Sequence, residues 1–385
     1  MLSVYICGNN AISSLGFTTE EHIDKIKKDI SGVSLVTDRN LYPENFYASL
    51  VDTGRLEREF SKLADNKAFT RFEKLMILSA DKAIKGNPKI DVSSEKTIFI
   101  ISSTKGNIDL LDSRNKDFFL QERNYLWKAA KIISSYFKNP NKPIIISNAC
   151  ISGVLAIING ANILSLGGYE NAVIVGGDIV SEFVVSGFLS FKSLAFGICK
   201  PFDANRNGLN LGEGAGTLIL TNKKENISAD TIIEVSGGAS NNDANHISGP
   251  SRTGEGLYLA ISRAMKQAGV DAGKIDFVSA HGTATPFNDE MESKAFAWVG
   301  LSDVPLNSLK AFFGHTLGAA GIIESVISLY GMQENKIYKT LGYEEYGVPE
   351  RITIAGQLLE KEQYCILKTA SGFGGCNAAV VFEKE

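Results

Sequence analysis

Short, continuously apolar runs rich in β-branched residues recur along the chain and predict buried strands. Polar residues do not alternate with the apolar ones, so we expect each strand to be covered on both faces. The runs occupy residues 97–102, 143–148, 171–177, 217–221, 231–237, 275–280, 364–371 and 378–383.

Helical patterns separate several of these strands, and this alternation predicts an α/β architecture with helix-covered sheets. The order of elements is approximately duplicated, which predicts an N-terminal half at 1–230 and a C-terminal half at 231–385. The charged segment 105–140, dotted with aromatic residues, is predicted to be an excursion that caps the site or contacts a partner. The helices are expected over 72–85, 151–168, 254–269 and 318–332.

Composition excludes several classes of protein. A chain of 385 residues, with 44% apolar and 21% charged side chains, is typical of a globular protein built from two packed halves. A net charge of −4 provides no field suited to nucleic acid. Ser152, Asn159, Asn162 and Ser165 interrupt the apolar run 151–168, which favours a buried helix over a membrane span. We therefore expect no nucleic-acid partner and no membrane insertion.

The cysteines and the first residues indicate a compartment. The chain starts without the basic segment and apolar run of a secretory signal. Its five cysteines are odd in number and include no CxxC pair, so we expect reduced thiols, no zinc site and a cytoplasmic location. They are Cys7, Cys150, Cys199, Cys365 and Cys376.

Cys150 is the candidate nucleophile. It follows the strand 143–148 and opens the helix 151–168, where the positive end of a helix dipole favours a thiolate. We therefore expect its pKa to be lowered from ~8.5 towards neutrality. A buried structural cysteine is the alternative, and the histidine motifs described next favour the nucleophile.

Two histidines stand in motifs rich in glycine and small residues. His281 begins HGTATPFND at the end of a predicted strand, and His315 lies in GHTLGAAG. Strand ends feed the crevice where ligands bind in α/β proteins, so an imidazole there suits catalysis. Thr283 and Thr285 are spaced to line one side of a channel. A loop histidine satisfied by its neighbours is the alternative for each isolated residue.

Charged residues near these motifs need partners if they are buried. Lys310 and Glu324 interrupt an otherwise apolar stretch, and we expect Glu292 to pair with Lys310. Asp289 is expected to hold the loop after His281 by bonding local backbone. Solvated charges are the alternative.

The turn 371–375, SGFGG, has backbone N–H groups that can point at a developing oxyanion. Phe373 in this turn is expected to pack over an acyl channel, and Cys376 beyond it is assigned to packing. His22 is expected on an exposed helix face without a role. His246 lies in a loop near the site, with structural use favoured.

The chain resembles the β-ketoacyl synthases, and most closely the elongating, acyl-carrier-protein-dependent synthases of fatty-acid and type II polyketide or polyene pathways. The motifs occur between about residues 98 and 382, in the family's order. They are ACISG around Cys150, PFDANRNGLNLGEGAG (201–216), DANH (243–246), HGTATPFND, KAFFGHTLGAAG and GFGGCN.

This resemblance implies a thiolase fold, in which two duplicated α/β halves form a five-layered αβαβα architecture. It also implies a decarboxylative Claisen condensation between a cysteine-bound acyl group and malonyl-carrier, without metal or organic cofactor. Acyl- and malonyl-loaded carrier proteins are the implied partners, with a dimer formed by two copies or with a ketosynthase-like paralogue.

The resemblance also assigns roles. Cys150, His281 and His315 match the catalytic triad. Phe373 matches the source of one oxyanion N–H, and Cys150 itself supplies the other. The supporting polar positions match Lys310, Glu292, Glu324 and Asp289, and the pantetheine-contacting positions match Thr283 and Thr285.

Three departures favour a specialised polyketide or polyene pathway. Asn207 stands where many relatives have aspartate, and Ser371 where fatty-acid enzymes often have phenylalanine. The strand end 103–107 lacks the glycine-rich sequence often seen there, and the loop before residue 201 is short. Two rival functions remain: a non-catalytic chain-length partner, and a cysteine acyl hydrolase. The intact Cys150 argues against the first, and the second leaves Lys310 and one histidine unexplained.

Overall fold

The computed structural model describes residues 2–112, 114, 119–243, 246 and 249–385. Eleven of the described strands form one long sheet that narrows at its middle, where β1 and β9 pair only between Tyr5 and Glu234, and two small sheets hold the others. In spatial order the strands are β13 (Thr353–Ile354), β11 (Pro305–Asn307), β10 (Phe277–Ser279), β15 (Cys365–Gly372), β16 (Cys376–Lys384), β9 (Ile233–Asn242), β1 (Tyr5–Ile12), β8 (Gly214–Thr221), β6 (Asn171–Asp178), β4 (Thr97–Ser102) and β5 (Ile144–Ile146).

The two sides of this narrow point repeat one pattern. On one side β5, β4 and β6 are parallel, and β8 and β1 follow antiparallel. On the other side β11, β10 and β15 are parallel, and β16 and β9 follow antiparallel. This is the duplicated α/β thiolase fold that the resemblance implies. A boundary between the halves near residue 230 stays a prediction.

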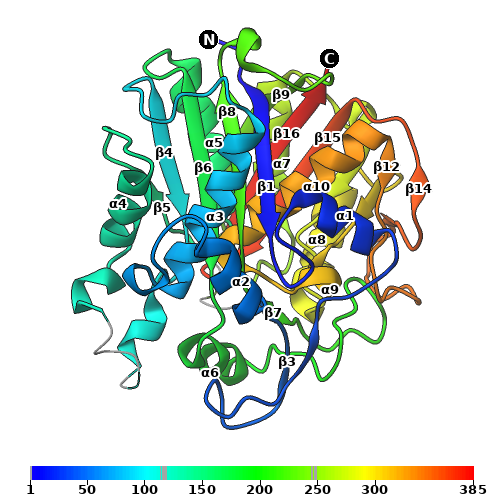
Figure 1. Cartoon of the computed structure of the whole chain (residues 1–385). Coiled ribbons are helices and arrows are strands. Elements are labelled where there is room, and N and C mark those ends of the chain that lie inside the picture. Colours follow the sequence, from blue (N-terminus) through cyan, green and yellow to red (C-terminus); the bar gives the residue numbers. More distant parts are fainter. Residues whose placement is uncertain (1, 113, 115–118, 244–245, 247–248) are drawn as a thin grey trace.

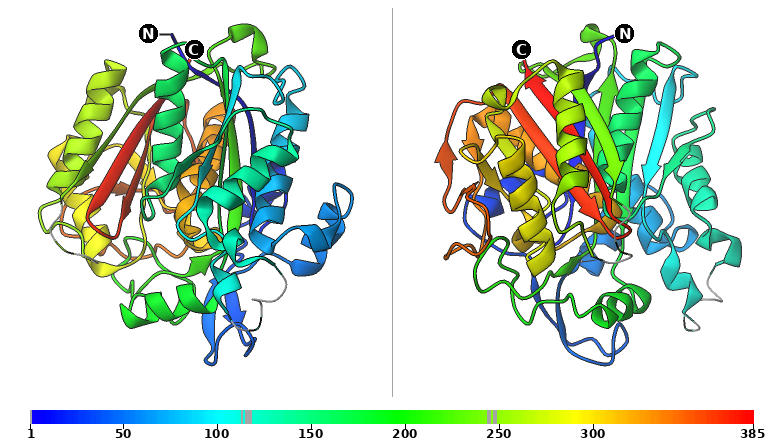
Figure 2. Two further views of the ribbon diagram at one scale, coloured as in Figure 1. Left: turned by 90° about the vertical axis from the view of Figure 1, so that its left-hand side faces the viewer. Right: turned by 180° about the vertical axis from the view of Figure 1, so that it is seen from behind.

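Helices complete the five layers, as Figures 1 and 2 show. We call the side with β5, β4, β6, β8 and β1 the first sheet and the other side the second sheet. Helix α3 (Arg71–Gly86) covers the outer face of the first sheet, and α7 (Glu255–Ala268) and α8 (Pro286–Trp298) cover that of the second. Between the sheets lie α5 (Ser152–Ser165) and α10 (Ala320–Glu334), in contact with strands of both. All four helices expected from the sequence are therefore present.

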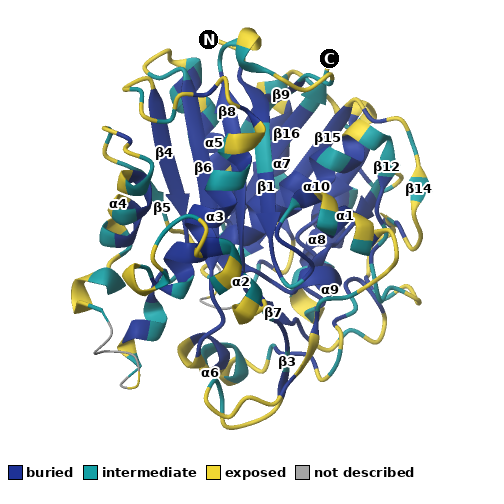
Figure 3. Cartoon of the chain, viewed as in Figure 1, coloured by how far each residue is buried: buried dark blue, intermediate teal, exposed yellow. Residues whose placement is uncertain are grey.

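The strands are buried on both faces, as their unbroken apolar runs predict. In β4, Ile98 and Ile100 face the central core around α5 and α10, whereas Phe99 and Ile101 face the core under α3. Figure 3 shows the strands buried and the outer surfaces of the covering helices partly exposed. Because helices cover both faces, the loops that carry Cys150 and His281 lie at strand ends.

Helices α5 and α10 approach closely through glycines. A Cβ atom on Gly321 would lie 2.6 Å from the backbone nitrogen of Val154, and one on Gly153 would lie 3.0 Å from Gly318 O. Neither helix can withdraw without opening the central core. The contact therefore fixes the start of α5, just after Cys150, against the start of α10, just after His315.

The remaining elements surround this frame. In the predicted excursion 105–140, helix α4 (Leu126–Tyr136) packs against α3 beside β5. A capping or partner role for this excursion stays a prediction. Residues 113 and 115–118 lie outside the described residues. The remaining elements are α1 (Thr19–Ile26), α2 (Thr53–Phe60), α4 (Leu126–Tyr136), α6 (Glu182–Ser190), α9 (Lys310–Phe313), β2 (Ser34–Val36), β3 (Phe46–Ser49), β7 (Leu211–Gly212), β12 (Lys336–Ile337) and β14 (Leu359–Glu360).

The exposed position expected for His22 is wrong. The side chain is fully buried, with Nε2 2.7 Å from Ser13 Oγ and Nδ1 2.7 Å from Thr18 O. Burial lowers its pKa to about 4, so the ring is a neutral bridge between α1 and the end of β1. The charged neighbours Glu20 and Asp24 are exposed, whereas His22 lies on the buried face of the helix.

No helix within the described ranges is both long and apolar enough to cross a membrane. The run 151–168 forms α5 inside the central layer instead.

Candidate active site

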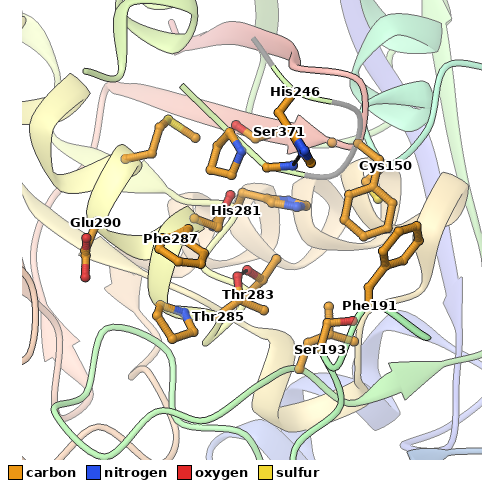
Figure 4. A pocket seen from close by; sticks show the side chains of 18 of the residues that line it. Cys150, Phe191, Ser193, His246, His281, Thr283, Thr285, Phe287, Glu290 and Ser371 are labelled. Atoms are coloured by element: carbon orange, nitrogen blue, oxygen red, sulfur yellow. Dashed lines mark hydrogen bonds between the residues drawn. The ribbon is translucent and has the colours of Figure 1, made fainter. Parts of the chain in front are cut away.

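A cavity of about 1070 Å³ brings together the three residues proposed for catalysis, Cys150, His281 and His315. Helix α6 lies beside it, at the end of the molecule opposite both termini (Figure 1). Both halves contribute to its walls. The other residues that line it include Phe188, Phe191, Lys192, Ser193, Asn207, His246, Arg252, Thr283, Thr285, Phe287, Glu290, Lys294, Ser371 and Phe373, several of which Figure 4 shows.

Cys150 is presented on a sharp turn before α5. Ala149 has a φ of 43°, a left-handed conformation that is unusual for a residue with a Cβ. The hydroxyl of Ser152 holds this turn, since it donates to Ala149 O at 2.6 Å and accepts from Asn148 N at 2.8 Å. The turn points the thiol into the cavity from a helix start, as the sequence indicates.

The expected lowering of the Cys150 pKa is wrong for the resting chain. Burial raises the pKa of this thiol to about 12, and the proximity of Cys376 acts in the same direction. Lys310 lowers it, but by less than burial raises it. Cys150 therefore rests as a thiol, and its proton must leave as the sulfur attacks.

Alkylation of Cys150 provides a test of this protonation state. Below the pKa the thiolate fraction rises about tenfold per pH unit, so we expect the iodoacetamide rate to rise about as steeply from roughly pH 7 to 10. The rate is measured by mass spectrometry of the peptide that contains Cys150. A plateau already at neutral pH would show that the helix start, and not burial, controls the thiol.

The loop that carries His281 is held by two buried carboxylates of α8. Glu292 accepts hydrogen bonds from the backbone nitrogens of His281 (2.8 Å) and Gly282 (2.7 Å), and Asp289 accepts from that of Thr283 (3.0 Å). Burial raises the pKa of Glu292 to about 7 and that of Asp289 to about 6. Both side chains therefore act on the backbone of the loop, and the imidazole is left directed into the cavity.

His315 faces His281 edge to face, with ring centroids 5.1 Å apart and an interplanar angle of 83°. Its backbone pairs with the strand entering β7, since His315 N donates to Asn210 O (2.7 Å) and Gly212 N donates to His315 O (3.0 Å). Within the described chain, Nδ1 of His281 and both ring nitrogens of His315 make no hydrogen bond to protein.

The two imidazoles are uncharged. Burial lowers the pKa of both rings well below the ordinary histidine value, and Lys310 and Lys368 add to the effect. A neutral imidazole offers one N–H donor, so these two buried rings can place two donors against one developing negative charge.

The predicted pairing of Lys310 with Glu292 is wrong. Lys310 forms its ion pair with Glu324 of α10, and it donates to His281 O at 3.0 Å. Glu292 is occupied by the backbone of the histidine loop. A second buried lysine, Lys368, also pairs with Glu324 and was not predicted; its signal is a single charge inside the apolar run 364–371.

The turn between β15 and β16 approaches Cys150. A Cβ atom on Gly372 would lie 3.0 Å from the backbone nitrogen of Cys150 and equally far from Cys376 Sγ. The ring of Phe373 lies against those of Phe188 and Phe191, at 5.5 and 5.0 Å between centroids. Phe373 therefore covers one wall of the cavity beside the cysteine.

A network of polar side chains, which the sequence analysis did not predict, joins this turn to Asp243 in the cavity wall. Ser371 Oγ lies 2.7 Å from Asn377 Oδ1, and Asn377 Nδ2 donates to Asp243 Oδ1 at 3.0 Å. Asp243 N in turn donates to Gly375 O at 2.9 Å. The DANH and GFGGCN motifs are the signal that could have indicated this network.

Thr283 and Thr285 line the cavity together, with their hydroxyl oxygens 2.8 Å apart (Figure 4). His246 also lines it, as its loop position suggested. In the part of the chain that the structure describes, no group of three or more His, Cys, Asp or Glu side chains is arranged to hold a metal ion.

Two family models match most of the chain, including Cys150, His281 and His315. The β-ketoacyl synthase N-terminal domain matches residues 1–226, and the β-ketoacyl synthase C-terminal domain matches residues 232–344. The chain belongs to the β-ketoacyl synthase family.

Individual relatives agree with this family. A putative mitochondrial 3-oxoacyl-[acyl-carrier-protein] synthase of Schizosaccharomyces pombe is 28% identical over 100% of this chain and 99% of its own length. A 3-oxoacyl-[acyl-carrier-protein] synthase 2 of Rhizobium meliloti is 30% identical over 70% of this chain and 67% of its own.

Solved structures share the fold. A β-ketoacyl synthase from Burkholderia phymatum superposes with a TM-score of 0.88 at 23% identity and covers 100% of both chains. The ishigamide ketosynthase/chain length factor gives a TM-score of 0.89 at 24% identity over 99% of each chain.

Proposed function

We propose that this protein is an elongating β-ketoacyl-[acyl-carrier-protein] synthase, acting in fatty-acid or in polyketide or polyene chain elongation. One observation carries the proposal: a buried cysteine and two neutral, facing imidazoles share one cavity. A nucleophile and two convergent N–H donors suit a reaction that first stores an acyl group and then stabilises an enolate.

In the first half-reaction, Cys150 Sγ attacks the thioester carbonyl of an acyl-carrier. The thiol proton passes to the departing carrier sulfur, the carrier thiol leaves, and an acyl-cysteine forms. The tetrahedral oxyanion is bound by the backbone N–H groups of Cys150 and Phe373, which the approach of the 371–375 turn to Cys150 supports.

In the second half-reaction, malonyl-carrier loses carbon dioxide, and the electron pair of the broken bond forms an enolate on the thioester. His281 and His315 donate N–H hydrogen bonds to its oxygen. The enolate carbon attacks the acyl-cysteine carbonyl, a carbon–carbon bond forms, and Cys150 leaves as the β-ketoacyl-carrier is released.

The remaining polar residues support binding. Thr283 and Thr285 line the cavity, which supports the proposed contact with the pantetheine arm. Lys192, Arg252 and Lys294 line the same cavity and are proposed to attract its phosphate. We further propose a dimer, of two copies or with a ketosynthase-like paralogue. A ketosynthase from Xenorhabdus doucetiae in complex with its chain length factor has the same fold, at a TM-score of 0.84 and 23% identity. A cytoplasmic location stays a prediction.

The test combines the purified chain with acyl-carrier and malonyl-carrier protein. We expect carbon dioxide and β-ketoacyl-carrier in equal amounts, measured by labelled-carbon release and by mass spectrometry of the carrier. Free fatty acid released without malonyl-carrier would instead indicate a hydrolase. Failure to form any acyl-enzyme would indicate a non-catalytic partner subunit, which the presence of Cys150 argues against.

A further inference from the structure

Two buried lysines hold three consecutive backbone carbonyls where β10 ends. Lys368 Nζ donates to Ser279 O at 3.1 Å and to Ala280 O at 3.2 Å. Lys310 Nζ donates to the next carbonyl, His281 O, at 3.0 Å. Two ammonium groups therefore fix the strand end that presents His281, through hydrogen bonds to three successive backbone carbonyls.

Both ammonium groups share one carboxylate. Glu324 Oε2 lies 2.7 Å from Lys368 Nζ, and its other oxygen pairs with Lys310. Lys368 is fully buried and also donates to Thr369 O at 2.8 Å. Three carbonyls and a carboxylate surround this nitrogen, and only the ammonium form has three N–H donors to offer them. Burial lowers the pKa of Lys368, whereas its pairing with Glu324 raises it, and the four acceptors around the nitrogen favour the ammonium form in the folded chain.

We propose that Lys368 is a positioning residue of the histidine pair, which fixes the strand end before His281 and supplies the positive charge that disfavours protonation of both imidazoles. Its consequence for turnover rests on the proposed function, whereas its effect on the imidazoles does not.

The surroundings of the pair determine the sign of this effect. Two lysines stand against a single carboxylate that both of them share, and the α8 carboxylates are held by the loop backbone. The excess of positive charge agrees with the lowered pKa of both histidines. The charged and titratable groups packed around the pair are Lys310 of α9, Lys368 of β15, Glu324 of α10, Glu292 and Asp289 of α8, and Cys150 before α5.

Removing the Lys368 charge leaves Glu324 neutralised by one lysine instead of two. The imidazolium form is then less disfavoured, so the pKa of His281 and His315 rises. Only the neutral rings are proposed to act. The pH below which the decarboxylation rate falls is therefore expected to rise by about one unit. At pH values below this point kcat is lower than in the natural chain, whereas KM for malonyl-carrier changes little.

The test compares Lys368→Met and Lys368→Gln with the natural chain. The chain has only four histidines, so ring-labelled histidine gives four NMR titrations, which single histidine replacements assign. We expect the His281 and His315 titrations to move to higher pH in both variants. Lys361→Met is the matched control, because Lys361 also donates to a backbone carbonyl, Asp276 O at 2.6 Å, but does not face the pair.

Unchanged histidine titrations in a folded Lys368 variant would overturn the proposal, even if activity were lost, because Lys368 would then be only structural. If Lys368→Met does not fold, Lys368→Gln retains N–H donors for the strand-end carbonyls and permits the same measurement. Shifted titrations in a chain that performs no condensation would contradict the proposed function and support the role of Lys368.

Discussion

Replacing Cys150 by alanine is expected to abolish acyl transfer to the protein, with a loss of about 10⁴-fold or more. No other cysteine lines the cavity within the described residues. The measurement is intact-protein mass spectrometry after incubation with acyl-carrier, followed by peptide mapping of any acylated site.

The matched control is Cys365→Ala. This thiol is buried like Cys150, and burial raises its pKa to the same value of about 12, but it lies in the core under α7. We expect acylation at the natural rate in this variant. Acylation that persisted in Cys150→Ala at the natural rate would refute the nucleophile assignment.

Replacing either histidine by alanine is expected to separate the two half-reactions. Loss of one preorganised N–H donor typically costs ~2.7–4 kcal/mol of barrier, so His281→Ala and His315→Ala should each slow decarboxylation by about 10²–10³-fold. Acylation depends mainly on Cys150 and the backbone oxyanion donors and should survive better. Labelled carbon dioxide release from malonyl-carrier is measured beside acyl-enzyme formation in the same samples.

Each variant provides its own control, because acylation and thermal unfolding report whether the fold persists. A hydrolase with a single Cys–His pair would lose turnover only when one particular histidine is replaced. Unchanged decarboxylation in His315→Ala would therefore contradict the two-histidine mechanism.

Much of the frame could be predicted because buried strands produce unbroken apolar runs. The run 97–102 is β4, and 364–371 lies almost wholly within β15. The central strand β1 was not predicted, because Gly8, Asn9 and Asn10 interrupt its apolar pattern. Pairing with β8 forms this strand despite its weak local preference, with a register shift between Ile6 and Gly8.

Site residues that lie in local sequence motifs could be predicted. Ion pairs between residues far apart in the sequence could not. The sequence placed Cys150 and both histidines in cavity-forming loops, and the structure brings them together. The sequence analysis chose Glu292 as the partner of Lys310, and the choice was wrong because nothing in the sequence distinguishes it from Glu324, since both lie on helices of the same half. Nor could it give the burial that raises the Cys150 pKa, because burial depends on the packing of distant segments.

The place of β16 in its sheet has a consequence for synthesis. This strand follows every other strand in the sequence, yet it pairs along both edges, with β9 and β15. The second sheet therefore closes only after residues 376–384 have left the ribosome, and long-range pairing of this kind forms slowly. Cys150 is made more than two hundred residues earlier. We expect Cys150 to be an ordinary, accessible thiol in the nascent chain, and to become buried beside the turn between β15 and β16 only after residues 376–384 have paired.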